Sequence, residues 1–296
     1  MPDPLPVPLS VPPPPGACAG VRFSAAYDAL LARWPAGTDE LDVPTPFGTT
    51  RVHAHGPAGA PPVLLLPGGG ATGLVWFRTA AALGARHRVL AADILGDAGR
   101  SVPQGRPLRT PDDLTAWLDA LLDGLGADRA HLVGHSYGAW IALSHALRRP
   151  GRVDRLVLLD PTQCFAGFRP GFLLRSLPVL LRPTAARALA YVDRETAGTA
   201  TDPEYKRLFA YAAEAFAGQR PVTGRRPDPS ALRAPLLVLL AERSAAHRAG
   251  AVAARARAAV PHARVETLPG LTHFALPTEL PPGALSGIGA FLDGRA

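Results

Sequence analysis

The chain has 296 residues, of which 47% are hydrophobic, so it holds enough apolar side chains for a sizeable buried core. Its net charge is +7, but the positive charge is almost all arginine scattered singly among alanine and proline, without the dense basic runs of a nucleic-acid-binding surface. We therefore expect no nucleic-acid partner. No run of about 18 uninterrupted apolar residues occurs, so we expect no membrane span either.

Residues 1–20 are rich in proline and lack both the basic start and the continuous apolar stretch of a secretion signal. We expect them to form a disordered or extended arm. Apolar residues then recur at helical spacing over residues 23–34, which predicts a short amphipathic helix ended by Pro35 and Gly37.

Strands and helices alternate in most of the remaining chain. The predicted strands cover residues 41–43, 49–53, 62–66, 88–92, 130–133, 155–159, 236–240 and 264–268. The predicted helices cover residues 75–83, 110–125, 139–147, 245–259 and 285–292. This alternation is typical of an α/β fold with a mainly parallel, doubly wound sheet covered on both faces.

The sequence Gly134-His135-Ser136-Tyr137-Gly138 lies between a predicted strand and a predicted helix. G-x-S-x-G at a strand-to-helix turn is the nucleophile elbow, in which a tight turn lifts the serine hydroxyl out of the sheet. Small residues two positions before and after the serine allow the strand and the helix to pack closely. We therefore expect Ser136 to be a nucleophile.

Residues 162–230 interrupt the alternation with helical stretches, prolines and no clean strand. We interpret them as a cap inserted into a core domain of residues 21–161 and 231–296. Many apolar residues of this segment must hold the cap together. The others suggest that it covers a lipophilic acyl or alcohol group above Ser136.

Serine needs a base that removes its proton. His273 is the best candidate, because its loop follows the last strand and such loops converge above a doubly wound sheet, where Ser136 points. His135 adjoins the serine but faces the wrong way on so tight a turn, so we interpret it as a packing residue. We also assign structural roles to the histidines in other helices, turns and strand starts, namely His87, His131, His145, His247 and His262.

Attack on a carbonyl creates an oxyanion, which two fixed backbone N–H groups would stabilise. The Tyr137 N–H at the start of the helix is one candidate. The glycine loop after the strand of residues 62–66 offers the other, and Gly69 is the best choice within it.

These segments together resemble the α/β-hydrolase superfamily from Phe23 to Leu292. Pro67 stands where the family usually has a histidine, but the expected oxyanion donor is a backbone group, so the chemistry is unaffected. Residues 93–101 resemble the family's loop after the next strand, with one residue more than the commonest spacing, and the resemblance gives them a structural role.

The resemblance places the family's acid at Ser244, where aspartate is expected. A serine cannot stabilise an imidazolium as a carboxylate does. Asp160 ends the preceding strand, as the acid does in some α/β-hydrolases, and a carboxylate leaving a buried strand needs a partner such as His273. We predict Asp160 as the acid. Glu242 is the alternative, although its side chain is expected to turn away, and a third possibility is that neither acts.

The resemblance and the motifs together predict a serine hydrolase that cleaves an ester or related acyl bond of a small lipophilic substrate through an acyl-enzyme, without a cofactor. Thioesterase, lactonase, amidase and acyltransferase reactions on the same fold stay open. A non-catalytic binding protein of the same fold is the alternative from another class, and Ser244 motivates it. The sequence makes no prediction of oligomeric state.

Cysteine usage bears on the compartment. Cys18 and Cys164 are too few for a disulfide framework, which fits a reducing cytoplasm, and no Cys/His spacing resembles a zinc site. The pair His53 and His55 lacks a third ligand nearby, so we expect no metal there.

Overall fold

A computed structural model describes residues 18–295. The expected proline-rich arm therefore lies outside the described residues, except for its last three positions. Helix α1 (Ala19–Leu31) already begins there, four residues before the helix start expected at Phe23. Its buried face consists of Phe23, Ala26, Tyr27 and Leu30.

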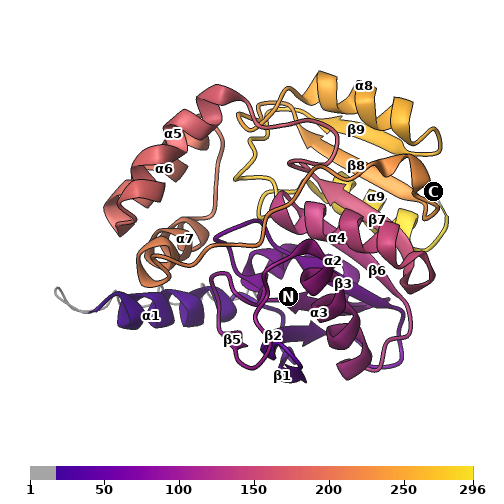
Figure 1. Ribbon diagram of the computed structural model, residues 1–296, viewed down its shortest axis with the longest axis horizontal. Coiled ribbons are helices and arrows are strands. Elements are labelled where there is room, and N and C mark those ends of the chain that lie inside the picture. The colour runs from indigo at the N-terminus through magenta and orange to yellow at the C-terminus, as the bar shows by residue number, and fades with distance from the viewer. Residues whose placement is uncertain (1–17, 296) are drawn as a thin grey trace, which may run out of the picture.

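One mixed sheet forms the centre of the molecule (Figure 1), with the strand order β1-β2-β4-β3-β6-β7-β8-β9 and β5 paired to β2. All neighbours from β4 to β9 are parallel, and β1, β2 and β5 are antiparallel. The strands are β1 (Asp39–Thr45), β2 (Gly48–His55), β3 (Pro62–Leu66), β4 (Arg88–Ala92), β5 (Val102–Pro103), β6 (Ala130–His135), β7 (Val153–Leu159), β8 (Leu236–Ala241) and β9 (Arg264–Leu268). The mainly parallel α/β sheet predicted from the alternation is confirmed.

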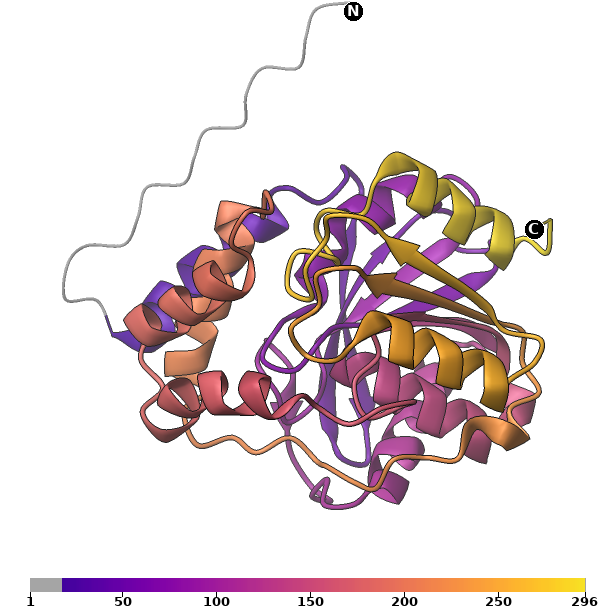
Figure 2. The same ribbon diagram turned by 90° about the horizontal axis from the view of Figure 1, so that it is seen from above.

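Helices cover both faces of the sheet, and Figure 2 shows them along its two sides. Helices α3 (Pro111–Gly124), α4 (Tyr137–Arg148) and α8 (Ala249–Ala259) pack on one face, and α2 (Phe77–Leu83) and α9 (Pro282–Leu292) on the other. Successive residues of a strand enter opposite cores, so Leu132 belongs to the first and Val133 to the second. Burial on both faces explains why these strands are continuous apolar runs rather than alternating ones.

The helix expected over residues 245–259 is shorter than predicted and begins at Ala249. The residues before it form a turn that directs Ser244 and His247 toward the end of β7. The two-residue strand β5 gave no periodic signal, because it is too short to show one.

Residues 162–230 carry α5 (Pro170–Leu181), α6 (Ala185–Glu195) and α7 (Pro203–Ala215), which lie together beyond one end of the sheet (Figures 1 and 2). Helix α1 runs alongside α7. Arg22 near its start pairs with Glu214 at the end of α7, and Arg33 just past its end pairs with Asp202 at the start of α7. The two helices are therefore antiparallel, and α1 packs against the segment of residues 162–230.

His131 on β6 predicts part of the acid sensitivity of the fold. Burial lowers its pKa to about 4, compared with about 6.5 for a free histidine. The folded state then binds fewer protons than the unfolded state, so this contribution to stability is complete above pH ~6.5 and is lost as the pH falls toward 4.

We expect His131→Phe to reduce the slope of the unfolding free energy against pH by about 1.2 kcal/mol per pH unit near pH ~5. Urea denaturation across the pH range measures the slope. Above pH ~7.5 the curves of both proteins should run parallel, since neither state then gains a proton at this site. Equal slopes at the lower pH would contradict the burial argument.

Candidate active site

Ser136 joins β6 to α4 with φ 51° and ψ −110°, a backbone conformation that non-glycine residues rarely adopt. The close packing of the turn imposes it. A Cβ atom on Gly138 would lie 2.3 Å from the Leu66 carbonyl oxygen, and one on Gly134 would lie 2.4 Å from the Gly138 oxygen. Only glycine fits at either position, and the strained turn presents the serine hydroxyl above the sheet.

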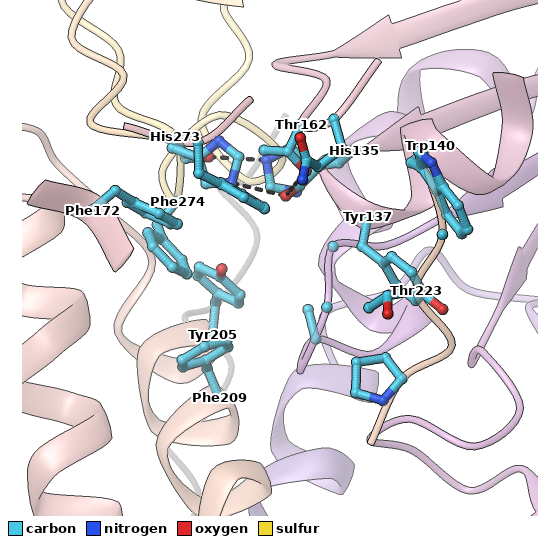
Figure 3. Close-up of a pocket in the computed structure, with 18 residues that line it drawn as sticks. His135, Tyr137, Trp140, Thr162, Phe172, Tyr205, Phe209, Thr223, His273 and Phe274 are labelled. Atoms are coloured by element: carbon cyan, nitrogen blue, oxygen red, sulfur yellow. Dashed lines mark hydrogen bonds between the residues drawn. The ribbon is translucent and has the colours of Figure 1, made fainter. Parts of the chain in front are cut away.

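The structure brings Ser136, His273 and Asp160 together at the carboxyl ends of the strands (Figure 3 shows the histidine beside the cavity). Ser136 Oγ lies 2.9 Å from His273 Nε2, and His273 Nδ1 lies 2.6 Å from Asp160 Oδ2. An ionised carboxylate only accepts hydrogen bonds, so Nδ1 carries the proton and donates a hydrogen bond to Asp160. Nε2 is then free to accept the serine proton, which is the arrangement that nucleophilic catalysis requires.

Asp160 is completely buried at the end of β7 and, like Ser136, has a positive φ, of 41°. Oδ2 accepts a hydrogen bond from Ser244 Oγ at 2.6 Å in addition to that from His273, and Oδ1 accepts one from the Ala241 N–H at 3.0 Å. His247 Nε2 lies 3.2 Å from Oδ1. Burial by itself would raise the pKa of the carboxyl, but the approach of His247 and the bond from His273 outweigh it and hold that pKa below its usual range. Asp160 is thus an anion.

The alternative acid, Glu242, is exposed and turns away from His273. Its Oε2 accepts a hydrogen bond from the Gly270 N–H at 2.8 Å, which fixes the start of the loop that carries the histidine. Sequence reasoning missed the contacts of Ser244 and His247 with Asp160. These contacts could have been predicted from the sequence, because position 244 lacks the expected aspartate and the neighbouring strand ends in Asp160.

His135 is not turned away from the site as expected, since it lines the same cavity as Ser136. Its Nε2 lies 3.0 Å from the backbone oxygen of His273, and the two rings lie 4.8 Å apart between centroids. Burial, helped by His273, lowers the pKa of His135 to about 3, so the ring is neutral near pH ~7. Its Nε2–H donates a hydrogen bond to that oxygen and so links the elbow to the histidine loop.

The expected oxyanion donors, Gly69 and Tyr137, lie side by side, because a Cβ atom on Gly69 would be 3.7 Å from the Tyr137 Cβ. Their neighbours are already engaged: the Gly70 N–H donates to Asp97, and the Gly138 N–H donates to the Pro67 oxygen. Within residues 18–295 the N–H groups of Gly69 and Tyr137 have no backbone or side-chain acceptor. Burial raises the pKa of Asp97, which accepts the hydrogen bond from the Gly70 N–H, to about 6.

A cavity of about 290 Å³ opens in front of Ser136. In Figure 3 one wall consists of Phe172, Tyr205, Phe209 and Phe274 and the other of Tyr137, Trp140 and Thr223. The first wall comes from α5, α7 and the histidine loop, and the second from α4 and the chain that follows α7. No Asp, Glu, Lys or Arg among the described residues lines it, so it suits an uncharged apolar ligand.

In the described part of the chain, no group of three or more His, Cys, Asp or Glu side chains could hold a metal ion. Between residues 18 and 295, no helix combines the length and the apolar character needed to cross a bilayer.

A sequence model of the alpha/beta hydrolase family matches residues 63–285, which include the elbow, Asp160 and His273. The chain belongs to this family. The resemblance inferred from the motifs is therefore confirmed.

Two relatives from Bacillus subtilis (strain 168) match about half of the chain. Carboxylesterase YbfK is 38% identical over 152 residues, which are 51% of this chain and 51% of that protein. The uncharacterized carboxylesterase nap is 33% identical over 153 residues, which are 52% of this chain and 51% of that protein. The matched part of the chain thus spans about half the length of these curated relatives.

Solved structures match over a larger share of the chain. The crystal structure of carboxylesterase CesB (YbfK) from Bacillus subtilis has a TM-score of 0.86 and 29% identity, and the match covers 93% of this chain and 99% of that one. Naproxen esterase (carboxylesterase NP) from the same organism has a TM-score of 0.82 and 25% identity, with 94% and 99% covered.

Replacing Gly138 by alanine tests the packing of the elbow. We expect Gly138→Ala to abolish soluble folded protein or lower the free energy of unfolding by several kcal/mol, because its Cβ would overlap the backbone of β3. Gly287→Ala in α9 is the matched control. Its Cβ meets nothing within 4 Å, so it should raise that free energy by about 0.5–1 kcal/mol. Urea denaturation measures both, and a neutral Gly138→Ala would contradict the packing argument.

Proposed function

We propose that the protein is a serine esterase that cleaves carboxylic esters through an acyl-enzyme. The observation that carries this proposal is the continuous chain of contacts from Ser136 Oγ to His273 at 2.9 Å and from His273 to Asp160 at 2.6 Å. The similarity of the chain to carboxylesterase YbfK supports the same activity.

The first half of the reaction follows from this geometry. Ser136 Oγ attacks the ester carbonyl while its proton passes to His273 Nε2, and the Asp160 carboxylate stabilises the resulting imidazolium. The N–H groups of Gly69 and Tyr137 stabilise the oxyanion. When the intermediate collapses, the carbon–oxygen bond to the alcohol breaks, and His273 returns the proton to the leaving oxygen.

In the second half, His273 takes a proton from water, whose oxygen attacks the acyl-enzyme carbonyl. The same N–H groups receive the second oxyanion. Collapse releases the carboxylic acid and restores the proton on Ser136. No cofactor enters either half.

The substrate is a small lipophilic ester. The aromatic walls of the cavity and the lack of charged side chains among its described lining residues favour uncharged groups on both sides of the ester bond. The alternative of a non-catalytic binding protein rested on Ser244, and its hydrogen bond to Asp160 removes that motive.

We also propose a cytoplasmic location. Cys18 is exposed and Cys164 is buried, and both are free thiols. Unpaired cysteines fit a reducing compartment.

Covalent labelling tests the nucleophile. A fluorophosphonate probe should label the wild-type protein, because the activated Ser136 Oγ attacks its phosphorus. The Ser136→Ala variant should lose the label while keeping its circular dichroism spectrum. Labelling that persists in this variant, or no labelling of folded wild type, would refute the esterase proposal.

The choice of acid is tested with two carboxyl-to-amide changes. Asp160→Asn should lower kcat for a p-nitrophenyl ester by about 10³- to 10⁴-fold, because an amide cannot stabilise the imidazolium and favours the wrong tautomer of His273. Glu242→Gln is the matched control and should stay within about threefold of wild type, because its contact is with the backbone of the loop only. The reverse order of the two effects would transfer the role to Glu242.

A further inference from the structure

Helix α5 presents an apolar face that no described residue covers. Among residues 18–295, five of the eight exposed large hydrophobic side chains belong to this one helix, and Leu180 and Leu181 are 70% and 77% exposed. The five are Leu173, Leu174, Leu177, Leu180 and Leu181, here named the leucine face. Their spacing follows the helical period, so they form one stripe. Exposed apolar clusters of this kind mark interaction sites.

The opposite side of the same helix is anchored in the cap. Phe172 is buried, lines the cavity, and lies near Tyr191 and His273 with ring centroids 6.3 Å and 6.0 Å apart. Figure 1 shows α5 at the outer margin of the cap, away from the sheet. The helix is thus fixed on its inner side and open on its outer side.

The surroundings of the leucine face are basic. Residues 161–192 include four arginines and no aspartate or glutamate. Arg175 pairs with Glu195, whereas Arg169, Arg182 and Arg187 are exposed and have no ion pair within the described chain. Arg182 directly follows the last residue of α5. The Arg187 guanidinium donates a hydrogen bond to the backbone oxygen of Arg182 at 3.4 Å. Two free cations therefore lie beside Leu180 and Leu181.

The carboxylates of the neighbouring helices are already paired. Glu195 pairs with Arg175, Asp193 with Lys206, and Glu214 with Arg22. A second copy of the chain docked on this face would bring like charges together without free carboxylates to compensate them. An anionic lipid surface offers an apolar layer that covers the leucines and negative headgroups that pair with the arginines.

We propose that α5 docks the protein on the surface of an anionic lipid bilayer, with the leucine face among the upper acyl chains and Arg182 and Arg187 among the headgroups. The helix lies in the interface and does not cross it. Because Phe172 of the same helix lines the cavity, docking brings a wall of the active site next to the lipid. The docking rests on the leucine face of α5 together with Arg182 and Arg187, and it holds independently of the proposed esterase activity.

The test is flotation of the whole protein with vesicles. Wild type should bind vesicles of phosphatidylcholine containing about one third phosphatidylglycerol, bind pure phosphatidylcholine vesicles much more weakly, and dissociate at high salt. The triple variant Leu174→Gln, Leu180→Gln, Leu181→Gln should lose about tenfold or more in affinity. The pair Arg182→Gln, Arg187→Gln should lose about 25-fold, or about fivefold per charge.

Two controls separate docking from folding and from catalysis. Val102→Gln changes an exposed apolar residue on β5, outside the leucine face, and should bind as wild type does. Ser136→Ala should also bind normally, because it changes only the candidate nucleophile. The leucine and arginine variants should keep the wild-type circular dichroism spectrum.

Three results would overturn the proposal. The first is no binding of wild type to the anionic vesicles. The second is equal binding of the triple leucine variant. The third is a dimer, detected by light scattering, that dissociates when the leucines are substituted, together with no binding to vesicles. This result would assign the leucine face to a second copy of the chain.

Discussion

The buried carboxylate of Asp160 determines the arrangement of the whole site. Four groups converge on it: the His273 ring, the Ser244 hydroxyl, the Ala241 N–H and the His247 ring. An unpaired charge at this depth would cost several kcal/mol, so the surrounding segments must stay where they can compensate it. The carboxylate thereby fixes the tautomer of His273, and through it the orientation of Nε2 toward Ser136.

The proposed acid, Asp160, lies one strand away from the position where the family resemblance expects it, and the sheet explains why this is possible. Strands β7 and β8 are parallel neighbours in register, so their carboxyl ends lie next to each other. A carboxylate at the end of β7 reaches the same imidazole nitrogen that one after β8 would reach. Ser244, which occupies the position where the family has its acid, donates a hydrogen bond to the Asp160 carboxylate.

The sequence predicted the features that depend on local pattern. Strands buried on both faces appear as apolar runs, and the elbow has glycines because its turn leaves no room for a Cβ atom. Asp160 and His273 lie 113 residues apart, so their contact depended on the order of the strands rather than on any local signal. Family resemblance together with the rule that parallel strands end at one edge supplied that order.

Features that depend on tertiary packing were out of reach from the sequence. The direction of the His135 ring depends on the backbone of a loop far along the chain. The shortened start of α8 depends on the contacts of Ser244 and His247 with Asp160. The exposed side of α5 was equally hidden, because an apolar helix gives the same pattern whether its leucines are covered or not.

The antiparallel pairing of α1 with α7 stabilises one wall of the cavity. Tyr205 and Phe209 of α7 form part of its wall, and ion pairs hold that helix to α1 near both ends. Phe23 of α1 and Phe216 just beyond α7 add an edge-to-face contact at 4.9 Å. Lifting α7 alone would break all three contacts, whereas swinging both helices together would keep them. This wall of the cavity therefore depends on a helix from the distant N-terminal part of the chain.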